Sequence, residues 1–386
     1  MTIDIDSAPA VFAGSQDFTV GIEEEFAVLD PVSLELVGRF EDLRLAAEAA
    51  DPVLAASITA ELIRSEIEIR SGRGENLHAA VACQRDVRAR LFALAAAQGV
   101  ALGATGTHPF SDYREQAIID TEHYRRVAEG LQYVARRNNT FSLHVHVGVR
   151  DLDRAVKVCD RLRPVLPLLL AISANSTCVD ARDSGLHSAR TQVFTKSFPR
   201  CGVPDPYGGW PAFADYLHML VETESIVEYT QVWWSVRPHL SFGTVEVRIC
   251  DVQTTAAESE AMAAIIVACV AQAARDLDED RPFIDPPRRL VEENLWRALR
   301  FGLDGELIDF DDAQRTELYP ARAALDRLAT WTAPVRAELA IDVNWPLEHN
   351  GAQRQRRQLD AGATVEQMYA ASVRETSDTY AVQVPA

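Results

Sequence analysis

Three consecutive glutamates, Glu23, Glu24 and Glu25, stand between apolar residues in the segment 19–30. The segment has the alternating pattern of a β-strand, whose side chains point to opposite faces in turn. Glu23 and Glu25 therefore share one face, while Glu24 falls on the apolar face. A solvated sheet face would explain the shared pair if it stood alone.

Three further segments, 61–70, 141–149 and 244–250, repeat this design of an apolar face opposite a face with ionisable residues two positions apart. Their polar faces carry Arg64, Glu66, Glu68 and Arg70 in the first segment, Ser142, His144 and His146 in the second, and Glu246 and Arg248 in the third. If the four strands share a sheet, one face collects carboxylates that would raise one another's pKa unless cations lay among them. We therefore interpret this face as a metal site.

The ligand types favour Mg2+, with Mn2+ as the alternative, because carboxylates with one or two imidazoles suit these ions better than zinc. Mg2+ held by carboxylates usually accompanies the phosphates of a nucleotide. Arg237 and Arg248 would neutralise a phosphoryl group during its transfer. Because the chain contains no G-x-x-x-x-G-K-[ST] motif, these residues predict an ATP-dependent reaction without a P-loop.

The composition limits the class of partner and the compartment. A formal net charge of -19 argues against a nucleic-acid partner, because binding to phosphate backbones depends on clustered Lys and Arg. The six cysteines are scattered without a CxxC pair, which favours a reducing compartment. The N-terminal segment lacks the order of a signal peptide, and the apolar runs 164–174 and 261–271 fall short of a membrane span. We expect a cytoplasmic protein with no membrane partner.

The elements that must position these residues are short strands mixed with long helices. Helical spacing of apolar residues predicts four helices, over residues 75–98, 152–173, 256–277 and 288–300. Strands and helices do not follow the regular βαβ order of a doubly wound sheet. We therefore expect an α+β fold built on a mainly antiparallel sheet.

The domain organisation expected from the sequence is simple. No repeat, linker or change of composition divides the chain. We expect one catalytic domain over residues 16–376, with flexible ends at residues 1–15 and 377–386.

Seven motifs in order along the chain resemble those of the carboxylate-amine ligase family known as glutamate–cysteine ligase type 2. They are GIEEEF (21–26), GATGTHPF (103–110), LHVHVG (143–148), WWSVRPH (233–239), FGTVEVRICD (242–251), ENLWRALRFGLDGELID (293–309) and NGAQRQR (350–356). This resemblance covers nearly the whole chain. It implies a core like that of glutamine synthetase and guanido kinases, in which the concave face of a curved sheet holds ATP and divalent metal and helices back the sheet.

The resemblance also implies metal ligands. Carboxylates that bind metal in the family match Glu23, Glu25, Glu68 and Glu246, and Glu61 also has an acidic counterpart. Strict alternation puts Glu61 on the opposite face from Glu68, so a bulge or a strand end is needed to bring the two together.

The same likeness assigns residues to the nucleotide. His144 matches a residue at the metal or nucleotide site, and Arg248 matches an arginine that contacts phosphate. Arg237 is the second candidate cation for ATP binding and catalysis. The chain has Phe141 and Ser142 where the family often has Cys-Gly before LHVHVG, and this departure bears on substrate preference.

Three further assignments rest on the residues alone. Glu66 shares the face of Glu68 and is a metal ligand or the ion-pair partner of a neighbouring arginine. Arg190 is a candidate anchor for a substrate carboxylate. His146 binds substrate or makes a hydrogen bond behind His144.

The implied reaction is the ATP-dependent formation of a γ-glutamyl amide, with glutamate and cysteine as the family's substrates and an acyl phosphate as intermediate. A ligase with another amine acceptor or another carboxylate donor is the first alternative. A metal-dependent amide hydrolase is the second, because a His-x-His pair among carboxylates can activate water. The partners expected are small molecules, and the helical surfaces leave room for a homodimer.

Overall fold

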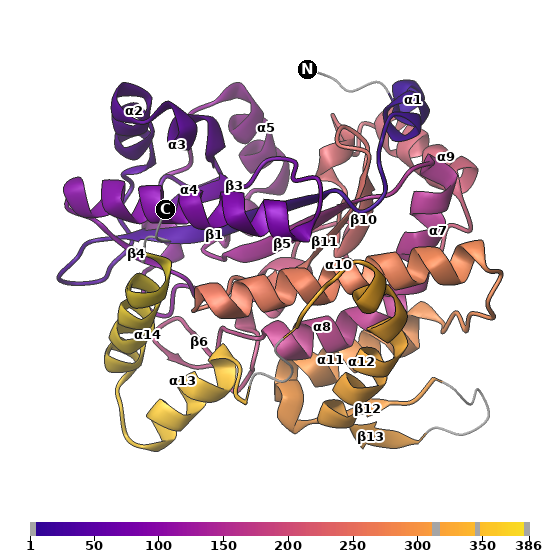
Figure 1. Ribbon diagram of the computed structural model, residues 1–386. Coiled ribbons are helices and arrows are strands. Elements are labelled where there is room, and N and C mark those ends of the chain that lie inside the picture. The colour runs from indigo at the N-terminus through magenta and orange to yellow at the C-terminus, as the bar shows by residue number, and fades with distance from the viewer. Residues whose placement is uncertain (1–4, 311–316, 344–347, 382–386) are drawn as a thin grey trace.

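A seven-stranded antiparallel sheet forms the centre of the molecule, for which a computed structural model describes residues 5–310, 317–343 and 348–381 (Figure 1). The main path across the sheet has the order β10-β11-β5-β1-β3-β2, and β4 pairs with the end of β1. These strands are β10 (Val236–His239), β11 (Thr244–Asp251), β5 (Ser142–Gly148), β1 (Val20–Leu29), β3 (Glu66–Arg70), β2 (Ile58–Thr59) and β4 (Ala101–Gly103). The expected α+β fold with a mainly antiparallel sheet is confirmed.

The strand register sets the chemistry of one face. Glu25 lies opposite Glu68 on β3, and Glu23 lies opposite His144 on β5. On the other side of β5, His146 lies opposite Glu246. Because directly opposed residues of antiparallel strands have neighbouring side chains on one face, the ionisable residues of four strands meet there.

Helices cover the opposite, apolar face of the sheet. The covering helices are α4 (Leu77–Ala97), α7 (Leu152–Leu162), α8 (Leu166–Ser173) and α10 (Ala256–Asp278). The sheet contributes buried apolar side chains such as Ile22 and Val145 to this core. Where residues 152–173 were predicted as one interrupted helix, a short 3-10 turn at Arg163–Val165 separates α7 from α8, since proline cannot continue the backbone hydrogen bonds of a helix.

Helix α10 is the longest of these helices and is largely buried. Among the described residues it is the one helix long and apolar enough to cross a membrane, and 78% of that apolar stretch is buried inside the molecule. The expectation that residues 261–271 fall short of a span therefore holds for the run itself but not for the 23-residue helix around it. The helix begins with a capping box between Thr255 and Glu258.

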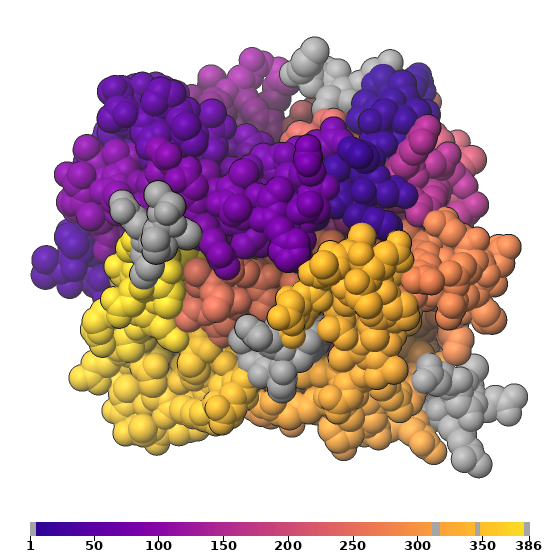
Figure 2. Space-filling model, in the orientation of Figure 1, coloured from indigo at the N-terminus to yellow at the C-terminus, as the bar shows by residue number. Residues whose placement is uncertain are grey.

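The remaining elements surround this core. They are α1 (Ala8–Ala13), α2 (Phe40–Ala50), α3 (Pro52–Ser57), α5 (Glu122–Leu131), α6 (Tyr133–Arg136), β6 (Cys178–Val179), β7 (Arg182–Asp183), β8 (Cys201–Gly202), α9 (Trp210–Glu222), β9 (Trp233–Trp234), α11 (Arg288–Phe301), β12 (Glu306–Ile308), β13 (Leu318–Pro320), α12 (Ala321–Glu338), α13 (Gly351–Asp360) and α14 (Val365–Tyr380). In the space-filling view, the N-terminal part lies above the C-terminal helices (Figure 2).

The ends of the chain are more ordered than the sequence suggested. Residues 5–13 are helical and bury Phe12 completely, and helix α14 continues to Tyr380. The Tyr380 ring packs edge-on against Phe26, and its hydroxyl donates to the carbonyl of Gln253 at 2.9 Å. The segments 5–15 and 377–380, for which flexible ends were expected, contribute buried apolar side chains to the core. Residues 1–4 and 382–386 lie outside the described part of the chain.

Candidate active site

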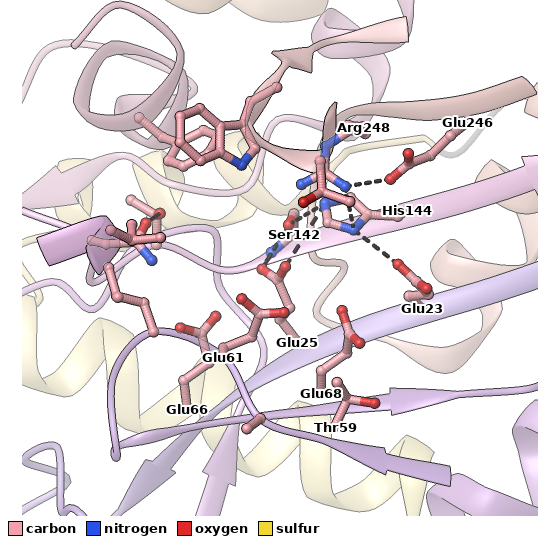
Figure 3. Close-up of a pocket in the computed structure, with 18 of the residues that line it drawn as sticks. Glu23, Glu25, Thr59, Glu61, Glu66, Glu68, Ser142, His144, Glu246 and Arg248 are labelled. Carbon is pink, nitrogen blue, oxygen red and sulfur yellow. Dashed lines mark hydrogen bonds and ion pairs between the residues drawn. The ribbon is translucent and has the colours of Figure 1, made fainter. Parts of the chain in front are cut away.

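The polar face of the sheet lines a cavity of about 300 Å³. All six glutamates predicted as metal ligands lie on its wall: Glu23, Glu25, Glu61, Glu66, Glu68 and Glu246. In the close-up their carboxylates converge from β1, β3, β11 and the segment before β3 (Figure 3). His144, Arg190, Arg237 and Arg248 line the same cavity. His146 lies behind Glu23 and borders an adjoining hollow instead.

Glu25, Glu61 and Glu68 form one cluster, in which one oxygen of each lies within 4.8 Å of the others. Glu61 reaches this side of the sheet because β3 begins only at Glu66, so the residues before it do not follow strand alternation. The strand end that was required to bring Glu61 and Glu68 together is therefore present. Arg64, predicted on the polar face, lies in the same irregular segment and donates to Glu41 at 2.9 Å instead.

Glutamates in and beside this cluster have raised pKa values. Burial and the neighbouring carboxylate of Glu25 raise the pKa of Glu61 to about 8. Burial and the surrounding glutamates also raise the pKa of Glu66 and of Glu68 well above the ordinary value. Oxygen Oε2 of Glu66 is buried without a hydrogen-bond partner among the described residues. A divalent cation would satisfy these oxygens and allow them to ionise, so the residues fit a hard metal ion.

A second cluster joins Glu23, His146 and Glu246, again with ligand atoms within 4.8 Å of one another. Burial opposes ionisation of Glu23, but His146 and His144 offset it and hold the pKa of that carboxyl well below its ordinary value. Burial likewise opposes ionisation of Glu246, and Arg237 with its neighbour Arg248 lowers the pKa of Glu246. This second cluster is therefore anionic without a metal.

His144 connects the two clusters. Its Nε2 lies 2.7 Å from the hydroxyl of Ser142, and its Nδ1 lies 3.3 Å from Glu23. Burial and the cation of Arg248 lower the pKa of His144, so the imidazole is neutral at neutral pH and able to donate a lone pair. Glu23, Glu68 and His144 also form a third group of ligand atoms within 4.8 Å.

His146 has a different environment. Its Nδ1 lies 3.0 Å from the hydroxyl of Thr244, and its Nε2 lies 3.4 Å from Glu23 and 3.8 Å from Glu246. Burial opposes protonation, but the two glutamates raise the pKa of His146 above its ordinary value. His146 thus lies behind Glu23 and bonds Thr244, and the expectation that it binds substrate or supports His144 stays a prediction.

The two predicted arginines differ in how their donors are used. Arg237 donates to Glu246 at 2.6 Å and to the carbonyls of Thr230 and Val232 at 2.9 and 2.7 Å. Arg248 also donates to Glu246, but its Nε has no hydrogen-bond partner among the described residues. Arg237 therefore holds Glu246 in place, and Arg248 is the more exposed of the two cations, with 16% of its side chain accessible against 6% for Arg237.

Arg190 is brought to the same cavity from outside the sheet. It precedes the π-helix Thr191–Thr195 and is 3% exposed. Its two terminal nitrogens donate to the carbonyls of Ile249 and Arg248, both at 3.2 Å, while its Nε has no partner among the described residues. An arginine that lines a cavity is suited to bind an anionic group.

Other wall residues were missed or undervalued. The hydroxyl of Ser142 donates to Glu25 at 2.6 Å, and Arg70 lies 3.8 Å from Glu68. Trp233 is half-buried and lines the cavity, whereas Trp234 is buried. Tyr124 on α5, another wall residue outside the sheet, carried no sequence signal.

The chain resembles proteins of one family over most of its length. A profile of the family described as Glutamate-cysteine ligase family 2 matches residues 19–376. A protein of Solibacter usitatus is 38% identical over 346 residues, which are 88% of each chain, and one of Herpetosiphon aurantiacus is 32% identical over 364 residues, which are 94% of each. Both carry the provisional name glutamate–cysteine ligase 2.

Solved structures share the fold at low sequence identity. The glutamate–cysteine ligase of Francisella tularensis, in complex with AMP, has a TM-score of 0.69 at 13% identity and covers 95% of this chain and 91% of its own. A bifunctional glutathione synthetase of Pasteurella multocida has a TM-score of 0.63 at 12% identity, covering 97% of this chain and 54% of its own. The expectation of an ATP-dependent ligase is confirmed, and the chain belongs to glutamate-cysteine ligase family 2.

Proposed function

We propose that this protein joins the γ-carboxyl group of glutamate to the amino group of cysteine in a reaction driven by Mg-ATP. The observation that carries the proposal is the convergence of six carboxylates and the His144 imidazole on one cavity wall, beside Arg248. A site of this kind suits phosphoryl transfer, which depends on positioning and on stabilisation of charge.

Two groups of residues would hold Mg2+ in this proposal. Glu25, Glu61 and Glu68 form one group, and Glu23 with Glu246 forms the other. Glu66 lies beside the first group with an oxygen to spare, and His144 and His146 lie beside Glu23. When bound, the metal supplies positive charge that shields the phosphates of ATP from the glutamates around them.

The protein's own residues would then act on the substrates. A γ-carboxylate oxygen attacks the γ-phosphorus of ATP, ADP leaves, and the acceptor nitrogen attacks the acyl carbon, loses a proton and expels phosphate. Arg248, which lines the cavity, would stabilise the charge on the transferred phosphoryl group. Arg190 would orient the donor by binding its α-carboxylate. A cytoplasmic location, which we also propose, fits the use of ATP.

The alternatives are not equally supported. Family membership places the chain among ligases, which removes the ground for the amide hydrolase. A different amine acceptor or carboxylate donor is the remaining alternative. The part of the cavity wall outside the sheet, which includes Trp233 and Phe198, would select the substrate side chains. We propose cysteine as the amine acceptor because the relatives carry the provisional name glutamate–cysteine ligase 2.

A labelled substrate tests the proposed chemistry. Glutamate carrying 18O in its γ-carboxylate is incubated with the protein, Mg-ATP and a panel of amines that includes cysteine, and the products are weighed by mass spectrometry. The proposal predicts γ-glutamylcysteine together with phosphate that contains one 18O atom. An amide product with unlabelled phosphate would refute the acyl phosphate, and a product with another amine would replace the acceptor.

A further inference from the structure

A buried polar network behind Arg190 takes no part in the reaction described above. At its centre is Asp251, the last residue of β11, which is completely buried. Its Oδ2 accepts hydrogen bonds from the backbone nitrogen of Asn175 at 2.9 Å and from the hydroxyl of Ser176 at 2.7 Å. Its Oδ1 accepts one from the hydroxyl of Ser188 at 2.9 Å. A carboxylate surrounded by donors in this way is held in a single orientation.

The network fixes Arg190 at two points. The backbone nitrogen of Arg190 donates to the hydroxyl of Ser176, which itself donates to Asp251. At the other end, Nη1 of Arg190 lies 3.7 Å from Oδ1 of Asp251. The guanidinium of Arg190 donates to the carbonyls of Arg248 and Ile249. These carbonyls lie beside the bulge that interrupts the pairing of β11 with β5. Asp251 is therefore the charged partner of a buried cation that would otherwise be costly to keep on the cavity wall.

Two sequence motifs that the proposed chemistry does not use converge on this network. In the 350–356 motif, Gln355 accepts from the nitrogen of Thr177 at 3.0 Å and donates to Oδ1 of Asn175 at 2.9 Å. Gly351 packs so closely that a Cβ there would lie 1.9 Å from the same Asn175 oxygen. The 350–356 motif therefore fixes the segment that holds Asp251.

The 103–110 motif reaches Asp251 from the other side. The nitrogen of Gly106 donates to the carbonyl of Asn175 at 3.0 Å, and a Cβ at Gly106 would lie 2.6 Å from Cγ of Asp251. Only glycine allows the backbone to approach the carboxylate this closely. The 103–110 and 350–356 motifs thus both support Asp251, which ends the 242–251 motif.

We propose that Asp251 is a positioning residue that holds the guanidinium of Arg190 in the orientation that binds the substrate carboxylate. This inference rests on the proposed function for the identity of that substrate. The network as a whole connects α13 to the cavity wall through Asn175, Asp251 and Arg190.

The test compares Asp251→Asn with Asp160→Asn. Asparagine at 251 can still accept from Asn175 and Ser176 but removes the charge that faces Arg190. Asp160 is also buried and accepts two backbone hydrogen bonds, from Tyr207 and Gly208, at a site remote from the cavity wall. The KM for glutamate should rise about tenfold in Asp251→Asn, the loss expected for one hydrogen bond to a charged group, while kcat and the KM for ATP stay near wild type. Asp160→Asn should leave all three constants unchanged.

Further variants test whether Asp251 and Arg190 act through one contact. Adding Arg190→Lys to Asp251→Asn should raise the KM for glutamate no further than Arg190→Lys alone, because both changes disturb one contact. If Asp251→Asn does not fold, Ser176→Ala tests the same connection and should raise that KM in the same direction. Additive effects, or a KM for glutamate equal to wild type in the folded variant, would refute the positioning role.

A crystal structure of Asp251→Asn decides the matter independently of turnover. The proposal predicts that the Arg190 guanidinium leaves the carbonyls of Ile249 and Arg248, and an unmoved guanidinium would overturn it. If wild-type protein releases no ADP with glutamate, the proposed function fails, and the crystal structure still tests whether Asp251 positions Arg190.

Discussion

Three adjacent glutamates illustrate how position determines what the same side chain does. Glu23 and Glu25 face the cavity, whereas Glu24 is completely buried on the back of the sheet. There it accepts hydrogen bonds from Arg88 at 2.6 and 2.7 Å and from Gln84 at 2.8 Å. Glu24, which alternation places on the apolar face, therefore pairs with a buried charge behind the sheet.

Replacing Glu24 by Gln should destabilise the protein, because it leaves the buried guanidinium of Arg88 without its main counter-charge. We expect a loss of about 3–5 kcal/mol in the free energy of unfolding, measured by urea denaturation. Glu48→Gln is the matched control, since Glu48 pairs with Arg44 on the surface and its removal should cost less than about 1 kcal/mol. Equal losses in the two variants would contradict the account of Glu24.

The metal-free protein should lose stability as the pH rises. The pKa of Glu61 is about 8 in the folded protein and ordinary when unfolded, so between about pH 4.5 and 8 the folded state binds a proton that the unfolded state has lost. The free energy of unfolding should fall across this window by up to about 1.4 kcal/mol per pH unit for each such proton. Urea denaturation in EDTA measures the fall.

Mg2+ supplies the control for that titration. If the cation lies among Glu61, Glu66 and Glu68, adding it should stabilise the protein more at pH 8 than at pH 5, since protonated carboxyls bind metal poorly. A stability that rises with pH in EDTA, or a Mg2+ effect that is the same at both values, would show that these carboxylates are not the metal site.

Arg248→Lys should lower kcat by about 100-fold, because lysine keeps the charge but lacks the planar fork in which one guanidinium nitrogen bonds Glu246 while another faces the phosphoryl group. Steady-state ADP release measures the change. Arg200→Lys, at an arginine that stacks on Trp233 and donates to the carbonyl of Gln231, should keep kcat within about twofold. An active Arg248→Lys enzyme would remove Arg248 from the proposed transition state.

At the scale of the elements, the strands and long helices were predictable and the segments between them were not. Alternation places Glu23 and His144 on one face wherever a strand continues. It fails for Glu61 and Arg64, because β3 begins only at Glu66 and hydrophobic periodicity does not define where a strand starts. The family resemblance, rather than the pattern, identified Glu61 as part of the site.

Gly351 gives a test at this scale. A Cβ there would overlap Oδ1 of Asn175, so Gly351→Ala should push helix α13 away from the network and cost about 1–3 kcal/mol of stability. Gly130→Ala is the control, because Gly130 lies in helix α5 with open space around it and alanine should be neutral or stabilising. Thermal denaturation of both variants measures the difference, and a stable Gly351→Ala protein would show that this close approach does not matter.

At the scale of the whole molecule, the chain brings motifs separated by more than two hundred residues onto one cavity and its support. The residues of the sheet wall were predicted from their spacing and from the family likeness. Those that reach the cavity from elsewhere, such as Trp233 and Tyr124, depend on how loops and helices pack over the sheet. The connection from Gln355 to Asp251 is likewise a product of tertiary packing, which a single sequence does not display.

The most direct test of the central claim is ADP release with Mg-ATP, glutamate and cysteine, measured for wild type beside the Glu23→Gln, Glu25→Gln double variant. Glu260→Gln, which changes an acid on helix α10 that pairs with Arg85 and Arg88 behind the sheet, is the control. We expect ADP release that requires both amino acids, persists in the control and disappears in the double variant. Release that does not depend on glutamate, or that survives in the double variant, would contradict it.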